Sequence, residues 1–296
     1  MITVDGLTKR YGELAAVDGL SFTVEPGAVT GFVGANGAGK STTLRMLLGL
    51  DAPTAGTATF SGRRYCALPQ PARTVGALLD PRCAHPGRSA RDHLRWMAAA
   101  AGLPSARITD VLEQTGIARA ADRRVGGFSL GMRQRLGIAG ALLGDPAVLV
   151  LDEPLNGLDP DGIRWVRELL TGLAAQGRTV FVSSHLLGEL EHTAERVVVI
   201  GHGRLLAAGT IADLRGHTAV LRIVPADPCA TADLAGALDR AGGTVDRAPD
   251  GLSVRGLPPE AAGRVALERG VALRELSLHD RGLEAAVRAL SSGAAS

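Results

Sequence analysis

The chain has 296 residues, 46% of them hydrophobic, and its 32 basic and 30 acidic side chains leave a net charge of +2. This length suggests two domains with a buried core, and the near balance of charge argues against a nucleic acid as partner. Three scattered cysteines argue against a disulfide scaffold. No apolar run reaches the roughly 18–20 residues that span a bilayer, so we expect a cytosolic chain that meets a membrane only through a partner.

The first half of the chain predicts strands, then a glycine-rich loop, then helices. Residues 20–24 alternate between apolar and polar, and residues 29–33 are apolar throughout, as strands do. The second of these strands runs directly into GANGAGKST, and the leucine spacing after it predicts a helix at 42–50. Further helical patterns begin after Arg91, near residue 108 and after Ser129.

Short apolar and β-branched runs then predict three further strands, at 148–151, 179–182 and 197–200. Such runs are typical of parallel strands that are covered on both faces. We therefore predict an α/β fold with a mostly parallel sheet and an inserted helical segment at about 85–145.

The pattern changes after about His217, and we place a domain boundary between residues 216 and 217. The elements predicted beyond it are a strand at 220–224, a helix at 232–241, a strand pair within 244–255, a helix at 259–269 and a strand at 271–276. The order β-α-β-β-α-β predicts a split-βαβ, ferredoxin-like α+β domain. A final amphipathic helix at 283–290 precedes a Ser/Gly/Ala tail that we expect to be mobile.

The segment Gly34-Ala35-Asn36-Gly37-Ala38-Gly39-Lys40-Ser41 matches the phosphate-binding pattern GxxxxGK[ST] between a predicted strand and a predicted helix. In such a P-loop, backbone N–H groups surround phosphate oxygens, the lysine bridges the β- and γ-phosphates and the hydroxyl ligates Mg²⁺. Lys40 and Asn36 are also conspicuous, because the chain has only two lysines and two asparagines. The alternative is an ordinary turn in a glycine-rich protein, which the strand and helix on either side disfavour.

Two carboxylates, Asp152 and Glu153, follow the strand at 148–151. Ligands of open α/β sheets lie beyond the carboxyl ends of the strands, so we expect both to face the phosphates. One carboxylate can hold Mg²⁺ and the next can polarise an attacking water as a general base. A solvated pair of acids is the alternative.

The segment FSLGMRQR at 128–135, called the signature segment below, opens a predicted helix. Ser129 is a good N-cap for that helix, and a helix N-terminus of this kind also suits a γ-phosphate. Taken alone, this segment is a weak signal of phosphate binding.

The P-loop, the signature segment, LVLDEP, NGLD and His185 in SSHLLGELE occur in the order of an ABC-transporter ATP-binding subunit, which residues 2–215 resemble. The local sequence of the P-loop region most resembles that of the ATPases of ABC-2-type drug and antibiotic exporters. The C-terminal domain is similar to one in daunorubicin-resistance-type ATPases. The resemblance implies an ABC ATP-binding domain at 1–216 with an antiparallel β subdomain, and an accessory domain at 217–296. It also implies an ATPase on the inner face of the membrane that drives efflux of a drug-like, antibiotic or other amphipathic compound through separate permease subunits.

The resemblance implies site residues as well. Those that would contact ATP are Tyr11, Gly34, Asn36, Gly37, Ala38, Gly39, Lys40, Ser41, Thr42, Asp80, Ser129, Gly131 and Asp159. Tyr11 would stack on adenine, unless it is simply a surface aromatic. Ser41 and Asp152 would hold Mg²⁺, Glu153 would be the catalytic base, and His185 would contact the γ-phosphate and water, unless it is a core histidine.

In the family, the signature segment binds the γ-phosphate held by a second copy. Ser129 and Gly131 would therefore act across a head-to-tail homodimer, with residues 156–159 lining its interface and ATP joining the two copies.

Two positions depart from the family pattern. The usual LSGGQ reads FSLGM, with Leu130 in place of a glycine and Met132 in place of the glutamine. Asp80 stands where the family usually places a glutamine. An amide can donate and accept hydrogen bonds, whereas a carboxylate only accepts and adds negative charge near Mg²⁺. We therefore expect altered opening of the site and altered coupling to the membrane partner.

A second hypothesis is a non-transport ABC ATPase that acts on a soluble macromolecule. The chain has one P-loop and one signature segment, and the interval between them contains no coiled-coil heptads, which disfavours ABC-type translation factors and chromosome ATPases. A switch GTPase would leave the signature segment and His185 unexplained.

Overall fold

The computed structural model describes residues 1–185, 187–216, 220–248, 250–279 and 282–293. It divides into two compact units, Met1–Thr210 and Ile211–Ser292. The predicted boundary between 216 and 217 adjoins residues outside the described ranges and stays a prediction. The last helix runs to Gly293, three residues into the predicted mobile tail, and the rest of that tail lies outside the described residues.

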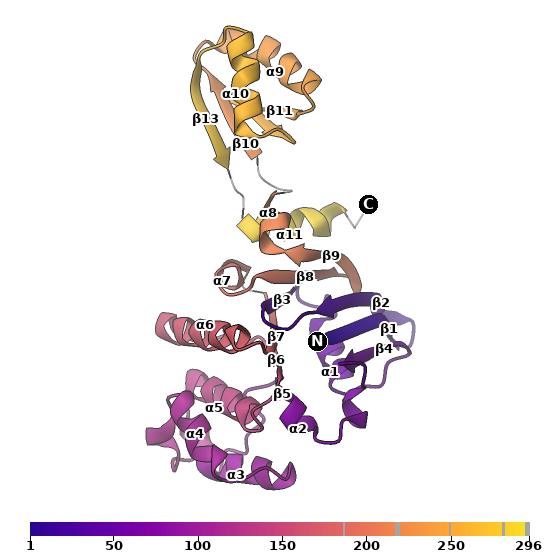
Figure 1. The fold of residues 1–296 in the computed structure, drawn as a ribbon, viewed down its shortest axis with the longest axis vertical. Coiled ribbons are helices and arrows are strands. Elements are labelled where there is room, and N and C mark those ends of the chain that lie inside the picture. Colours follow the sequence, from indigo (N-terminus) through magenta and orange to yellow (C-terminus); the bar gives the residue numbers. More distant parts are fainter. Residues whose placement is uncertain (186, 217–219, 249, 280–281, 294–296) are drawn as a thin grey trace. The chain divides into compact units, whose positions relative to one another are not determined.

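A six-stranded sheet forms the centre of the first unit (Figure 1). Its strands, in spatial order, are β5 (Val75–Leu78), β6 (Val148–Asp152), β7 (Thr179–Ser184), β3 (Val29–Val33), β8 (Arg196–Gly201) and β9 (Arg204–Thr210). The first five are parallel and β9 is antiparallel to β8. Every residue of β3, β6 and β7 is buried, because both faces of the sheet are covered. The predicted mostly parallel sheet is confirmed.

Helices and a second sheet cover the two faces. Figure 1 shows α6 (Pro160–Ala175) and α7 (Leu187–Glu191) on one side, and α1 (Lys40–Leu47) with a three-stranded antiparallel sheet on the other. The antiparallel sheet has the order β2-β1-β4, formed by β1 (Ile2–Tyr11), β2 (Leu14–Val24) and β4 (Ala55–Phe60). The short helices η1 (Tyr65–Ala67) and α2 (Pro71–Thr74) lead from β4 to β5.

Strand β2 begins six residues before the predicted strand at 20–24, and a break in the pleat explains the error. Gly6 and Gly19 both have positive φ, at 56° and 63°, and the pairing of β1 with β2 shifts register around them. A bulge interrupts the alternation of inward and outward side chains. The alternation of apolar and polar residues therefore ends at the bulge, although the strand continues.

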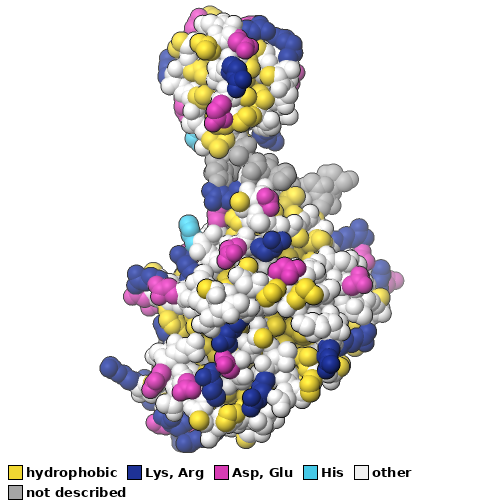
Figure 2. Space-filling view, viewed as in Figure 1, with side chains coloured by type: hydrophobic (Ala, Val, Ile, Leu, Met, Phe, Trp, Pro, Cys, Tyr) yellow, Lys and Arg dark blue, Asp and Glu magenta, His cyan; other side chains and the backbone are white. Residues whose placement is uncertain are grey.

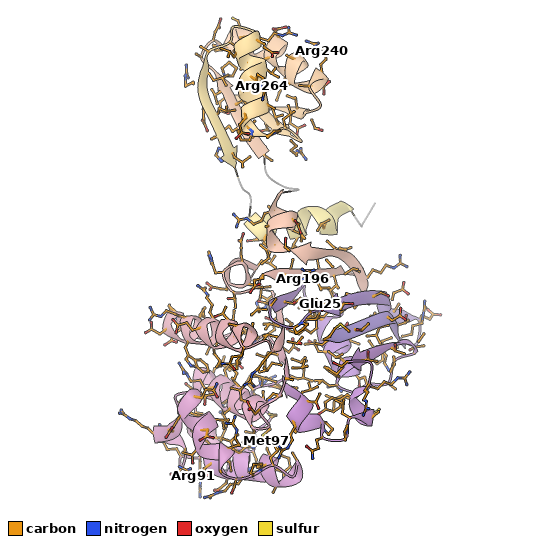
Figure 3. The ribbon with its side chains drawn as sticks, in the orientation of Figure 1. Glu25, Arg91, Met97, Arg196, Arg240 and Arg264 are labelled. Carbon is orange, nitrogen blue, oxygen red and sulfur yellow. The ribbon has the colours of Figure 1, made fainter. Side chains whose placement is uncertain are left out.

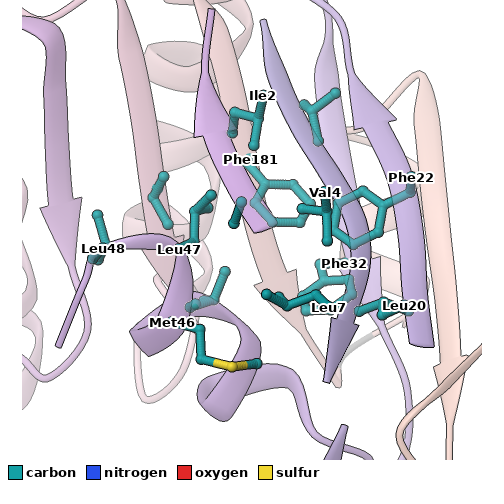
Figure 4. Packing of buried hydrophobic residues seen from close by; sticks show 14 of the residues in the cluster. Ile2, Val4, Leu7, Leu20, Phe22, Phe32, Met46, Leu47, Leu48 and Phe181 are labelled. Carbon is teal, nitrogen blue, oxygen red and sulfur yellow. The ribbon is translucent and has the colours of Figure 1, made fainter. Parts of the chain in front are cut away.

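The main core lies between the antiparallel sheet and the parallel sheet (Figure 4). The rings of Phe22, Phe32 and Phe181 contact one another, with centroids 5.1–5.7 Å apart. Leu44 and Leu47 of α1 are fully buried in the same cluster. Removing one such leucine side chain costs about 2–5 kcal/mol, so this core fixes the helix that begins at the P-loop.

The helical segment predicted at 85–145 is present. It contains α3 (Ala90–Ala100), α4 (Arg107–Gln114), η2 (Ala118–Ala120), η3 (Val125–Gly127) and α5 (Leu130–Leu142). Serine caps start its first and last α-helices, since the Ser89 hydroxyl accepts from Asp92 N and the Ser129 hydroxyl from Met132 N.

The second unit contains four strands and five α-helical or 3₁₀ elements within its described residues. They are α8 (Ile211–Gly216), β10 (Val220–Pro225), η4 (Pro228–Ala230), α9 (Thr231–Arg240), β11 (Thr244–Ala248), β12 (Gly251–Arg255), α10 (Pro259–Glu268), β13 (Leu273–His279) and α11 (Gly282–Gly293). The sheet order β11-β12-β10-β13, with antiparallel neighbours, places one strand between the two strands of each βαβ crossover. This is the predicted split-βαβ arrangement.

Aliphatic side chains of β10 and β12 pack against α9 and α10 in a separate core. The helices carry exposed arginines such as Arg240, and Figure 3 marks Arg240 on α9 and Arg264 on α10. On the visible face of the first unit, basic side chains are interspersed with acidic ones (Figure 2). Within the described ranges, no helix combines the length and the apolar character needed to cross a membrane.

Candidate functional site

The P-loop connects β3 to α1, and two of its glycines have no room for a side chain. A Cβ on Gly34 would lie 2.4 Å from Ile200 O, and one on Gly39 would lie 2.5 Å from Ala16 O. Gly39 also has φ = 104°, a conformation that other residues rarely adopt. No side chain caps α1 at this residue, so the first N–H groups of the helix are directed to a ligand position.

Lys40 is buried at the start of α1 and points back along the loop. Its Nζ donates to Gly34 O at 2.7 Å and to Ala35 O at 3.3 Å. Burial lowers the pKa of the Lys40 ammonium, and the nearby carboxylates Glu153 and Asp152 oppose that shift. The cation is thus fixed between the loop and the end of β6, which is the position needed to hold a phosphate against the loop.

Asp152, the last residue of β6, is held by two hydroxyl groups. Ser41 Oγ donates to Asp152 Oδ2 at 2.8 Å, and Ser183 Oγ donates to Asp152 Oδ1. Ser41 and Asp152 therefore bring a hydroxyl and a carboxylate oxygen together from α1 and β6. Mg²⁺ prefers oxygen ligands of this kind, so the pair fits such an ion.

Glu153 follows immediately and has an unusual backbone, with φ = 49°. Its N–H donates to Ser183 Oγ at 3.0 Å, and its carbonyl accepts from Gln134 Nε2 at 3.2 Å. Its carboxylate accepts from the backbone N–H of His185 at 3.3 Å and lies 2.7 Å from His185 Nδ1. Since an ionised carboxylate can only accept, Nδ1 carries the proton in this pair and Nε2 is left to face another partner.

These groups line two neighbouring clefts. The first, of about 500 Å³, contains P-loop and α1 residues together with the end of β6 and β7; its lining is Ala16, Asn36, Gly37, Gly39, Lys40, Ser41, Thr42, Glu153, Asn156 and His185. The second, of about 410 Å³, is lined by Leu79, Asp80, Pro81, Arg82, Leu130, Gln134, Asp152, Glu153 and Asn156. Glu153 and Asn156 belong to both, so the predicted base stands where the two clefts meet.

Asp80 lies in the second cleft but is already engaged by an arginine. Asp80 Oδ1 accepts from Arg82 N at 2.8 Å and from Arg82 Nε at 3.0 Å. The guanidinium of Arg82 holds the pKa of the Asp80 carboxyl below its usual range. Much of the negative charge that Asp80 was expected to add is therefore offset by Arg82, which the sequence analysis overlooked.

Six predicted site residues line neither of these two clefts, namely Gly34 and Ala38 within the P-loop and four residues outside it. Tyr11 is 51% exposed, and its hydroxyl donates to Asp51 Oδ2 at 3.4 Å. Asp159 caps α6 by accepting from Gly162 N at 2.8 Å. Ser129 and Gly131 lie at the exposed start of α5. Their predicted contacts with ATP therefore stay predictions.

Sequence reasoning missed Ser183 and Gln134 as parts of the site. Ser183 is the first serine of VSSH, and its proximity to His185 is the one signal that pointed to it. Gln134 is in the signature segment, but its contact with Glu153 joins residues 19 positions apart and depends on how α5 packs.

Comparisons with known proteins agree with this geometry. The family described as "ABC transporter" matches residues 17–156, and a domain of unknown function matches residues 225–284. The chain is 43% identical to the bacitracin transport ATP-binding protein of Bacillus licheniformis over 70% of this chain and 68% of that protein. It is 35% identical to the lantibiotic transport ATP-binding protein of Streptococcus pyogenes over 70% of this chain and 89% of that protein.

A Nod factor export ATP-binding protein of Ralstonia nicotianae is 40% identical over 73% of this chain and 69% of that protein. Among solved structures, an ATP-binding subunit of an ABC transporter is 30% identical, with a TM-score of 0.67 over 73% of this chain and 92% of the other. The resemblance inferred from the motifs is confirmed for the ATP-binding domain. With its P-loop, paired carboxylates and signature segment on this fold, the chain belongs to the family of ABC-transporter ATP-binding proteins and is an ATPase.

Proposed function

We propose that this chain is the ATP-hydrolysing subunit of an exporter that moves an antibiotic-like or other amphipathic compound through separate membrane subunits. The observation that supports this proposal is the assembled site at the ends of β3, β6 and β7, in a chain whose relatives are named for bacitracin, lantibiotic and Nod factor transport. The chain would act at the inner face of the cell membrane, in contact with its permease.

The chemistry follows from the residues at the end of β6. Lys40 and the P-loop N–H groups would bind the β- and γ-phosphates in the larger cleft. Ser41 and Asp152 would hold Mg²⁺, which supplies charge neutralisation on the phosphates. Glu153 would take the proton of the attacking water, and His185, oriented through Nδ1 by Glu153, would present Nε2 to the γ-phosphate.

Two copies of the chain would share each ATP. Ser129 is exposed and Gly131 half-buried at the N-terminus of α5, and neither lines its own subunit's P-loop cleft. A helix N-terminus with a serine cap attracts phosphate oxygens, so this end of α5 is suited to a nucleotide held by another copy. ATP binding would close the head-to-tail dimer, and hydrolysis would release it.

Contact with the permease would use a mostly apolar groove beside the two clefts that meet at Glu153, which together are called the catalytic cleft below. This groove, of about 360 Å³, includes Tyr65, Leu79, Asp80, Met97 and Leu136 in its lining. Leu79 and Asp80 line the catalytic cleft as well, so their loop reaches both spaces. An apolar helix end of the permease seated here would move with the loop that contacts the catalytic cleft.

A pull-down from detergent-solubilised native membranes tests this function. The bait is the tagged Glu153→Gln chain with MgATP, which would hold the dimer closed, and the control is the Lys40→Met/Glu153→Gln chain, which should not bind ATP. A multi-helix membrane protein recovered in stoichiometric amount with the first bait supports the exporter. Recovery of a ribosomal or other soluble partner, with no membrane protein, would overturn it in favour of a non-transport ATPase.

A further inference from the structure

Gln134 connects the signature helix to the backbone of the predicted catalytic base. It lies on α5, is only 2% exposed, and donates through Nε2 to Glu153 O at 3.2 Å and to Asn156 O at 3.4 Å. Both acceptors are carbonyl oxygens, which fixes the amide with its nitrogen toward them. Its Oε1 is buried and finds no partner among the residues that the structure describes. In this position the amide of Gln134 therefore acts as a hydrogen-bond donor.

The residue that Gln134 holds has a backbone that needs support. Glu153 has φ = 49°, a left-handed conformation that costs free energy for a residue other than glycine. The conformation is fixed from both ends of the residue, since Glu153 N donates to Ser183 O at 3.2 Å and Glu153 O accepts from Gln134 and from Asn156 N. Losing the Gln134 bond would leave the carbonyl of Glu153 held by Asn156 N alone, so the carboxylate would be less firmly positioned.

A second contact joins the same helix to the same loop. Leu130, the residue that replaces the family's glycine, packs over Gly157, so that a Cβ on Gly157 would lie 2.1 Å from Leu130 Cδ2. In the same way, a Cβ on Gly131 would lie 3.3 Å from Leu158 Cδ2. The first turns of α5 and the loop after β6 therefore interlock through apolar packing as well as through the Gln134 amide.

We infer that Gln134 is a positioning residue for Glu153 and that α5 links the two ATP sites of the dimer. This inference rests on the proposed function, in which the start of α5 binds the γ-phosphate of the other copy. Gln134, near the middle of α5, holds the base of its own copy. Binding of one nucleotide at Ser129 and Gly131 is then transmitted along α5 to the Glu153 that acts on the other nucleotide. The Gln134 amide is thus the contact through which α5 acts on the catalytic base.

The test replaces Gln134 by methionine, which has similar length and no donor. We expect kcat to fall about tenfold, since the hydrogen bond to the backbone of the base and the one to Asn156 O in the same loop are lost. The affinity for ATP should stay within about twofold, because Gln134 does not line the P-loop cleft. The Hill coefficient for ATP hydrolysis should fall toward one. Gln114→Met, which changes an exposed glutamine at the end of α4, is the matched control.

A second variant and two further measurements separate positioning from folding. Leu130→Gly removes the apolar contact with Gly157 and should lower cooperativity while leaving the unfolding temperature near that of the parent, because Leu130 is 45% exposed. If Gln134→Met keeps the parental kcat and Hill coefficient, or if kcat, ATP affinity and unfolding temperature all fall together, the inference is wrong. The assay uses the purified full chain, so its result can be interpreted even if the pull-down from membranes fails.

Discussion

The two sides of the catalytic cleft are built in different ways. On the side formed by the P-loop, β6 and β7, polar groups bond to residues far along the chain, such as Ser41 to Asp152, 111 positions apart, and His185 to Glu153, 32 apart. On the opposite side, Asp80 bonds to Arg82, only two positions away. Long-range bonds between separate elements of the fold hold their atoms fixed, whereas a local exposed pair can open without disturbing the fold.

This contrast indicates that the two sides of the cleft have different roles. The side with long-range bonds contains the groups that must be fixed within a fraction of an ångström for chemistry. The Asp80–Arg82 side also borders the apolar groove, where movement would be useful. We therefore expect substitutions on the first side to act on turnover and ATP affinity, and those on the second to act on coupling.

The largest effect is expected from Glu153→Gln. The amide keeps the shape of the side chain but cannot accept a proton from water, so turnover should fall by about 10²–10⁴-fold while ATP still binds. Steady-state ATPase assays and a nucleotide-binding assay measure the two effects. Glu168→Gln, which changes an exposed carboxylate on α6, is the control. Hydrolysis at the parental rate would show that Glu153 is not the base.

Lys40→Met should mainly weaken binding. In the proposed site the ammonium would make charge-assisted bonds to the phosphates worth roughly 1.5–3 kcal/mol each, so losing it should reduce ATP affinity at least tenfold. Titration calorimetry with ATP measures the change. Lys9 is the other lysine of the chain, and its ammonium donates to Ala52 O at 2.7 Å outside both clefts. Equal affinities for Lys40→Met and Lys9→Met would contradict the role given to the P-loop lysine.

The parts of this site that the sequence predicted are those whose residues are adjacent along the chain. The P-loop was recognisable because eight consecutive residues, between a strand and a helix, make the phosphate cradle. Asp152 and Glu153 were recognisable because a continuous buried strand ends at them. In the fold, the parallel sheet, the helical segment and the split-βαβ unit were all predicted from continuous runs of one period.

The parts that were missed depend on packing between separate elements. Gln134 reads as one residue of a helix until α5 is placed against the loop after β6. Ser183 lies in an apolar strand, and its hydroxyl contacts Asp152 only because β7 pairs with β6 in register, Asp152 opposite Ser183. The extent of β2 was missed for a different reason, because the bulge near Gly19 interrupts the alternating pattern.

Asp80→Gln tests the second side of the cleft. The amide restores a donor and releases Arg82, so stimulation of ATPase activity by the membrane partner should change by about two- to tenfold while basal hydrolysis changes less. The measurement compares ATPase activity with and without the permease, together with transport in vesicles. Asp246→Asn in the second unit removes a comparable exposed ion pair, with Arg255, and serves as control. Unchanged coupling and transport would show that Asp80 does not couple the apolar groove to the catalytic cleft.

The smallest effect is expected from Arg82→Ala, in the stability of the fold at different pH. Arg82 lowers the pKa of Asp80, chiefly through side-chain hydrogen bonds. A lowered pKa stabilises the fold above the unfolded-state value of about 3.9, and this contribution disappears as the pH falls through the folded-state value.

The Asp80 and Arg82 side chains are 48% and 74% exposed, so solvent screens their pairing. Arg82→Ala should therefore lower the unfolding temperature by no more than about 3 °C at pH 7, with the difference from the parent shrinking toward pH 3. Thermal unfolding followed by circular dichroism across this range measures it, with the exposed Arg63→Ala as control. A loss that is large, or that is the same at every pH, would mean that this side of the cleft is held by more than the local pair. The contrast with the P-loop side would then fail, because both sides would be fixed parts of the fold.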